Sequence, residues 1–201
     1  MKFDFVFLGQ SILKYQVPLE VFVSLNNIYE TKRKFLPLAT KQLAGKIKEE
    51  VSLFFSGPNS EKMHQHSFVS EDILKWFYSV FDHYLRWNKT HEFNMNINSI
   101  WVNDMKAGEY NPVHIHQGMH YTGLSSVMIL KLPTDMGPEI ARPDQPMNGQ
   151  LQIMGSASGQ FVTSDYMRHV VYPFNNKKEK RRTLVCNCDV EYNPVTSRTA
   201  Q

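Results

Sequence analysis

The chain has 201 residues, which is about the length of one domain. Its 22 Lys and Arg against 19 Asp and Glu give a formal net charge of +3, which excludes a polybasic, histone-like protein. Hydrophobic residues make up 42% of the chain, so a disordered chain is also excluded. Apolar runs such as Val127–Leu130 are far shorter than a membrane-spanning helix.

The first 90 residues are predicted to form a support region of strands and helices. Weak alternation predicts strand structure in the first 25 residues, with shared faces (Phe3, Phe5 and Phe7; Val21 and Val23). A helix is predicted over residues 39–55 from apolar residues at every fourth position (Ala39, Leu43, Ile47 and Val51). Ser70 is a candidate N-cap for a second helix over 71–87, with an apolar stripe (Leu74, Phe77, Tyr78, Phe81 and Leu85).

After residue 90 the periodicity changes from that of a helix to that of a strand. Short strands are predicted at 99–104, 109–116, 121–132, 150–155, 159–164, 168–173 and 181–190. So many short strands after two helices predict a mostly β, α+β protein built as a double-sheet jelly roll. We expect one domain over 1–201, with a support region (1–90), a jelly-roll core (91–190) and a flexible tail (191–201).

Histidines are the first candidates for chemistry. His114 and His116 lie two positions apart, so on a strand their side chains share one face and form half of a metal site. His169 on a later strand is the candidate third ligand, and imidazole suits iron, zinc, copper and nickel. A second pair, His64 and His66, lies in a polar loop without a strand pattern, and His120 is expected to face solvent or to support the site.

The charge run 177–182 is predicted to be a solvated hairpin whose end enters the last strand. Alternation places Arg181, Thr183, Val185 and Asn187 on one face of that strand and Arg182 on the other. An Arg followed two residues later by a hydroxyl, both facing a barrel interior, is a good clamp for a carboxylate.

Several blocks of the chain, in order, resemble the catalytic core of 2-oxoglutarate/Fe(II)-dependent oxygenases. The blocks are Trp101-Val102-Asn103, Gly108 to His116, Thr122 to Pro133, Gly149-Gln150-Leu151, Arg168 to Pro173 and Arg181 to Asn187. They cover roughly residues 99–190, and they are most similar to an oxygenase subgroup with a His-x-His motif found in bacteria and marine phages. Leu43 to Ile47 also looks like a helix of phage relatives.

This resemblance implies a double-stranded β-helix fold, an Fe(II) centre and 2-oxoglutarate as co-substrate. It implies His114 and His169 as iron ligands, and Arg181 with Thr183 as partners of the far carboxylate of 2-oxoglutarate. The usual motif has Asp or Glu where this chain has His116. A three-His centre, a two-His centre with water, and a centre with another carboxylate therefore stay open.

The leading functional hypothesis is a 2-oxoglutarate-dependent dioxygenase that hydroxylates an unidentified substrate and releases succinate and CO2. Trp101, Tyr110 and Tyr121 are candidates for the substrate-binding pocket wall, and Asn187 is a candidate beside the co-substrate. The alternatives are a cupin-type three-His metalloenzyme that does not use 2-oxoglutarate and a non-catalytic jelly-roll binding module. The discriminating residue is Arg181, because nothing requires an inward Arg without 2-oxoglutarate.

The expected partner is a small-molecule or protein substrate; a membrane or nucleic-acid partner is not expected, and a homodimer is left open. Cys186 and Cys188 lie two positions apart, too far for a relaxed disulfide on one strand. A chain without disulfides suits a reducing compartment, so we expect a cytoplasmic protein, in the host cytoplasm if a phage encodes it.

Overall fold

The architecture consists of two helices and two antiparallel sheets. The computed structural model describes residues 12–40, 43–88, 92–116, 123–139, 144, 146–154 and 168–192. The helices are α1 (Leu19–Lys32) and α2 (Glu71–Trp87). The strands are β1 (Glu50–Phe55), β2 (His66–Ser67), β3 (Phe93–Met105), β4 (Asn111–His114), β5 (Gly123–Lys131), β6 (Leu151–Met154), β7 (Arg168–Val171) and β8 (Arg181–Tyr192).

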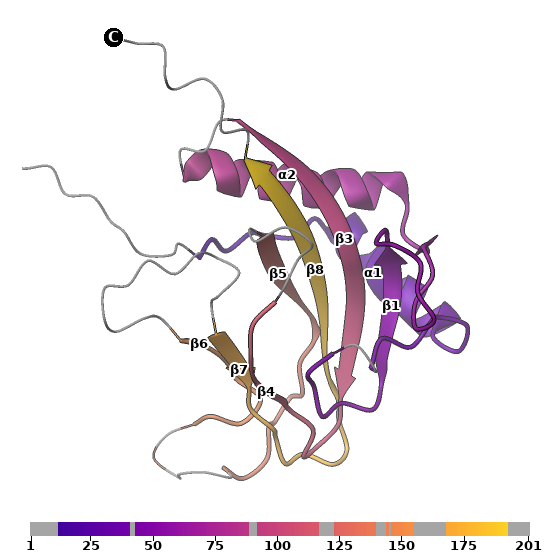
Figure 1. The fold of residues 1–201 in the computed structure, drawn as a ribbon. Helices are drawn as coiled ribbons and strands as arrows, with labels where there is room; N and C mark the ends of the chain where they lie inside the picture. The colour runs from indigo at the N-terminus through magenta and orange to yellow at the C-terminus, as the bar shows by residue number, and fades with distance from the viewer. Residues whose placement is uncertain are drawn as a thin grey trace, which may run out of the picture.

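The two sheets have the strand orders β2-β1-β3-β8-β5 and β4-β7-β6 (Figure 1). From β3 to β6, consecutive strands alternate between the larger and the smaller sheet, and every strand pair is antiparallel. This alternation is that of a jelly roll, so the predicted fold class, mostly β with helices in front, is confirmed.

Both helices pack on one face of the larger sheet, and the smaller sheet lies on the other side (Figure 1). On β8, Leu184, Cys186, Cys188 and Val190 join the core beneath the helices, whereas the odd-numbered residues 181–187 face a cavity. The two cysteines are buried and free. The period of two along this strand thus separates a helix-covered core from the surface that carries the polar residues.

A β-bulge in β3 changes which face of the sheet the odd-numbered residues of that strand occupy. The register with β8 shifts between Ile97 and Ser99. Ile97 therefore lies in the core under the helices, whereas Ser99 and Trp101, also odd-numbered, line the cavity. Without the extra residue, the second half of β3 would present its apolar residues to the cavity and its polar residues to the core.

Helix α2 matches its predicted bounds, and the reason is visible at its first turn. The Ser70 hydroxyl accepts a hydrogen bond from the Ile73 backbone N–H at 3.4 Å, and Glu71 and Asp72 follow it. Apolar side chains at four-residue spacing then pack against the larger sheet (Ile73, Phe77, Phe81 and Leu85).

The predicted helix over 39–55 is wrong. Residues 43–49 have no regular structure and Glu50–Phe55 form strand β1. The four-residue spacing was coincidental, because Ala39 and Leu43 pack with Trp101, Ile47 packs with Met105 and Phe174, and Val51 packs under the helices. Three separate clusters do not make one helix face. The similarity of 43–47 to a helix of phage relatives fails for the same reason.

The strand predicted around Val21 and Val23 is also wrong, because both residues lie in helix α1. The informative spacing was four rather than two: Val21, Leu25 and Tyr29 are buried, whereas Val23 is exposed.

Some sequence predictions concern parts of the chain outside the described residues. These are the Phe3, Phe5 and Phe7 strand, the strand at 159–164, and the tail from residue 193 onward; residues 191 and 192 belong to β8. Neither described helix has the length and apolar character needed to cross a bilayer.

Candidate metal centre and cavity

A cavity of about 640 Å³ lies between the two sheets. Its walls come from β1, β3, β5 and β8 on one side and from β4, β6 and β7 on the other, and residues just before and after β1 complete them. The polar side chains that line it are Glu50, Ser52, Ser99, Asn103, Asn111, His114, His116, His169, Arg181, Thr183 and Asn187. A concave site with this many converging polar groups is suited to a polar ligand.

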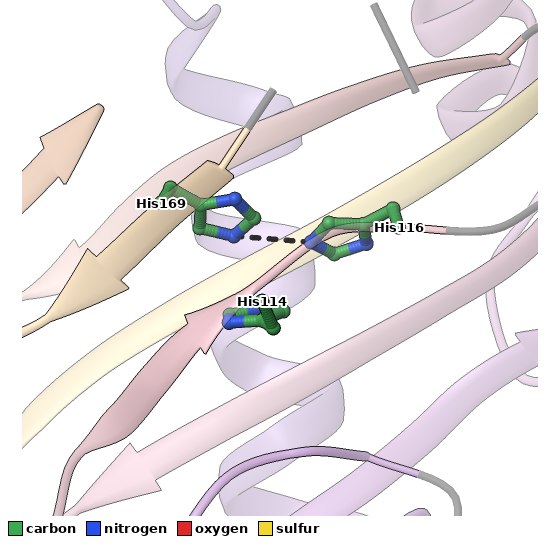
Figure 2. Close-up of side chains that lie close together, drawn as sticks. All are labelled: His114, His116 and His169. Atoms are coloured by element: carbon green, nitrogen blue, oxygen red, sulfur yellow. Dashed lines mark hydrogen bonds between the residues drawn. The ribbon is translucent and has the colours of Figure 1, made fainter. Parts of the chain in front are cut away.

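Three histidines converge on the small-sheet side of the cavity (Figure 2). His114 ends β4 and lies opposite His169 of β7 in the strand register, and His116 follows two residues later. One ring nitrogen from each lies within 4.8 Å of the others, and the Nε2 atoms of His116 and His169 are 3.1 Å apart. Two imidazoles bound at right angles to one ion would place their nitrogens about 3 Å apart, so this spacing suits a shared metal.

His114 is held in the tautomer that a metal ligand needs. Its Nδ1 lies 2.7 Å from the carbonyl oxygen of Pro112. A carbonyl only accepts hydrogen bonds, so Nδ1 carries the proton and donates it. The lone pair is then on Nε2, and the hydrogen bond fixes the ring orientation, as is usual for ligating histidines.

His116 is a neutral imidazole packed against an aromatic wall. Burial, followed by the nearby His169 and His114, lowers the pKa of His116 to about 3, and the nearby Asn187 side chain opposes this shift only in part. Trp101 stacks on the ring with centroids 5.9 Å apart. A half-buried, neutral imidazole can donate its lone pair to a metal ion.

The donor set therefore consists of three imidazoles. In the part of the chain that the structure describes, no Asp or Glu joins this group. Such a set suits iron, zinc, copper or nickel, so the site is consistent with Fe(II) without selecting it. A water in place of His116, or a carboxylate from outside the described residues, stays an alternative.

Arg181 is a buried cation on the same cavity wall. Its side chain is 2% exposed, its Nη1 lies 3.7 Å from the Met105 sulfur, and its Nε has no hydrogen-bond partner. Burial alone lowers the pKa of Arg181 to about 10, and no carboxylate in the described part of the chain pairs with it. A buried guanidinium in this condition requires an anion from a ligand.

Arg182 faces the opposite side of β8. Its Nε donates to Asp104 at 2.9 Å, its Nη1 donates to Glu30 at 2.7 Å, and its guanidinium lies 3.9 Å from the centroid of the Tyr29 ring. This arginine is fully partnered and ties β8 to α1. The two adjacent arginines thus have separate environments, as the alternation along β8 predicts.

The unpaired polar atoms are concentrated in the cavity. Five buried side-chain atoms in the described residues have no hydrogen-bond partner, and Thr40 Oγ1 is outside the cavity lining. The other four line it: Glu50 Oε2, Asn103 Oδ1, Arg181 Nε and Asn187 Oδ1. Buried polar atoms are nearly always paired, so this concentration indicates a ligand with complementary groups.

The predicted pocket-wall residues have different positions. Trp101 lines the cavity, and Thr183 and Asn187 line it as well. Tyr110 does not, because it lies in the turn into β4 with its side chain 37% exposed, while the following Asn111 points inward. Tyr121 and His120 lie outside the described residues.

The second His-x-His pair does not form a metal site. Both ring nitrogens of His66 form hydrogen bonds. Nδ1 lies 2.7 Å from the His64 carbonyl oxygen, and Nε2 lies 2.8 Å from the Ser52 hydroxyl oxygen. His66 lies in the short strand β2 and not in a loop, and with both ring nitrogens engaged it holds this segment against β1.

Sequence reasoning missed Glu50, Asn103 and Asn111. Asn103 and Asn111 could have been found, because both fall within blocks that resemble the oxygenases. Asn103 also lies two positions after Trp101, so on a strand the two side chains share one face. Glu50 could not have been found, since the segment around it was assigned to a helix.

Comparison with known proteins gives matches in structure only. No family model matches the chain, and no curated protein matches it in sequence. The fold is similar to a 2OG-Fe(II) oxygenase family oxidoreductase from Burkholderia pseudomallei, with 12% identity, TM-score 0.48, and 84% of this chain and 77% of that one covered. It is also similar to a prolyl-4-hydroxylase from Pseudomonas putida, with 14% identity, TM-score 0.45, and 86% and 87% covered.

Proposed function

We propose that this protein is an Fe(II)- and 2-oxoglutarate-dependent oxygenase that hydroxylates an unidentified substrate and releases succinate and CO2. The observation that carries the proposal is Arg181, a buried guanidinium in the cavity of the three histidines that has no carboxylate partner among the described residues. A metal site alone does not require such a cation, whereas a dicarboxylate co-substrate does.

The residues present fit both groups. His114, His116 and His169 would hold the iron. Arg181 would receive the far carboxylate of 2-oxoglutarate through two parallel hydrogen bonds, and the Thr183 hydroxyl, on the same face of β8, would add a third. When bound, iron and 2-oxoglutarate supply the oxidising chemistry. The chain itself binds and orients the co-substrate and shields the reaction from water within the cavity.

A cupin-type three-His metalloenzyme without 2-oxoglutarate is the second candidate. Three imidazoles without a carboxylate in the described residues favour it, because this set serves several metals. It leaves the buried charge of Arg181 unexplained, and for this reason we rank it second.

Substitution of Arg181 by Gln tests the proposal. We expect Arg181→Gln to raise the KM for 2-oxoglutarate at least about tenfold, from the loss of a charge-assisted contact. Succinate formation in the presence of Fe(II) and dioxygen is the measurement. The exposed Arg86 on α2, which pairs with Asp82, provides the matched control Arg86→Gln, which should leave KM unchanged.

Arg182 is a poor control in this experiment, because its removal would leave the buried Asp104 short of a partner. If the parent protein with iron restored releases no succinate, or if Arg181→Gln and Arg86→Gln behave alike, the oxygenase proposal fails and the cupin-type candidate takes its place.

A further inference from the structure

Glu50, on the cavity face of β1, is an ionisable residue for which the proposed reaction has no use. It is 1% exposed, and its Oε2 has no hydrogen-bond partner in the described residues. Asn103 lies directly opposite it in the register of β1 and β3, and Asn103 Oδ1 is also unpaired. Two unpaired acceptors thus lie side by side on the same cavity wall.

The co-substrate cannot satisfy these atoms. Ionised 2-oxoglutarate carries only hydrogen-bond acceptors, so it can pair with Arg181 but has no N–H or O–H to give to Glu50. The three histidines are grouped without Glu50, so a shared metal does not explain it either. A second ligand that brings hydrogen-bond donors is therefore required in the same cavity.

The charged groups around Glu50 indicate whether that hydrogen-bond donor is neutral or positively charged. Glu109 is the charged neighbour that acts on Glu50, and its own oxygens accept from the backbone N–H groups of Lys48 and Lys106. Arg181 lines the cavity too, but Glu50 Oε2 and Arg181 Nε both lack hydrogen-bond partners in the described residues, so the two side chains are not paired through these atoms. With Arg181 assigned to the co-substrate, a carboxylate at Glu50 is left without a cation.

The positions of the Glu50 and Asn111 side chains depend on Gly45. A methyl group at this position would collide with Asn111 Oδ1 and would come within 2.9 Å of Glu50 Oε1. The absence of a side chain at residue 45 therefore lets Glu50 and Asn111 take up their positions on the cavity wall.

We propose that the substrate carries a primary amine, and that its ammonium group binds to Glu50 and Asn103. This inference rests on the proposed function, because it assigns Arg181 to 2-oxoglutarate. An ammonium group offers three donors and a positive charge, which match an unpaired carboxylate oxygen and an unpaired amide oxygen. The amine would anchor the substrate while another part of it reaches the metal.

Direct binding of a small probe tests the inference. n-Butylammonium and n-butanol would be titrated, by calorimetry or ligand-observed NMR, into protein loaded with Fe(II) and 2-oxoglutarate without dioxygen. We expect n-butylammonium to bind the parent protein and to bind Glu50→Gln at least about tenfold more weakly. Glu49→Gln makes the same change of charge at the preceding residue, which faces Tyr29 and Lys180, and should leave binding unchanged.

Gly45→Ala is an independent second variant, and its methyl group should weaken n-butylammonium binding by a similar factor. Equal binding to the parent protein and Glu50→Gln, or no binding to the parent protein, would overturn the inference. Glu50-dependent binding of n-butanol alone would also overturn it, in favour of a neutral donor. The 2-oxoglutarate affinity, measured on the same samples, reports separately on the proposed function and should not depend on Glu50.

Discussion

At the residue scale, the cavity places charged groups where solvent cannot reach them. Arg181 and Glu50 are both nearly inaccessible, and neither has an ionic partner among the described residues. Unpaired buried charges destabilise a fold, so their presence in one cavity is the mark of a site that binds ligands. The surface arginine Arg86, by contrast, has its carboxylate partner within 2.8 Å.

Glu50 should make the stability of the protein depend on pH. Burial, and to a smaller extent Glu109, raises the pKa of Glu50 to about 7 from an ordinary value of 4.5. Below pH 4.5 the group is protonated in both states and has no effect. As the pH rises through 4.5 to 7 the unfolded chain ionises first, so stability is lost, by roughly 3 kcal/mol in total.

Glu50→Gln removes this loss. Chemical denaturation should therefore show the variant to be more stable than the parent protein at pH 8, and equally stable at pH 4. A stability difference that is the same at both pH values would show that folding does not raise the pKa of Glu50.

The metal ligands can be separated by single substitutions. In a three-His centre, His114→Ala, His116→Ala and His169→Ala should each lose bound iron, because each removes one of only three protein ligands. Metal analysis of the purified, iron-loaded variants measures this, with the exposed His83→Ala on α2 as control. Full iron content in His116→Ala together with its loss in the other two would establish a two-His centre.

At the element scale, β8 connects the cavity to the core beneath the two helices. Its odd positions carry Arg181, Thr183 and Asn187 into the cavity, and its even positions carry Arg182 and the apolar core. The sequence predicted this division because a regular strand obeys a period of two. The same reasoning failed before residue 55, where the apolar residues of one segment are distributed over three packing clusters that no local period encodes.

Asp104 connects three elements behind the cavity. It is fully buried, accepts from Arg182 at 2.9 Å and from Lys180, and lies under α1, whose Glu30 shares Arg182. Asp104→Ala should lower the free energy of unfolding by about 3–5 kcal/mol, because it leaves a buried guanidinium short of its partner. Asp82→Ala, which breaks the exposed pair with Arg86, should cost about 0.5 kcal/mol or less. Denaturation of both variants at neutral pH gives the comparison, and similar losses would contradict the assigned role of Asp104.

At the scale of the whole molecule, the fold brings distant parts of the chain to one cavity. His114 and His169 could be paired from the sequence, because a jelly roll places an early and a late strand side by side. Glu50 could not be added, since its place depends on β1 extending the larger sheet beyond β3. The histidines and Arg181 therefore followed from strand parity and resemblance, whereas the wall formed by β1 required the tertiary structure.

We propose that a metal ion and 2-oxoglutarate bind together in this cavity. Calorimetric titration of 2-oxoglutarate, without dioxygen, into the protein with and without Fe(II) tests it most directly. We predict one binding site per chain, strong dependence on Fe(II), and at least about tenfold weaker binding in Arg181→Gln. Binding of 2-oxoglutarate that is absent, or that is indifferent to both Fe(II) and Arg181, would contradict the account.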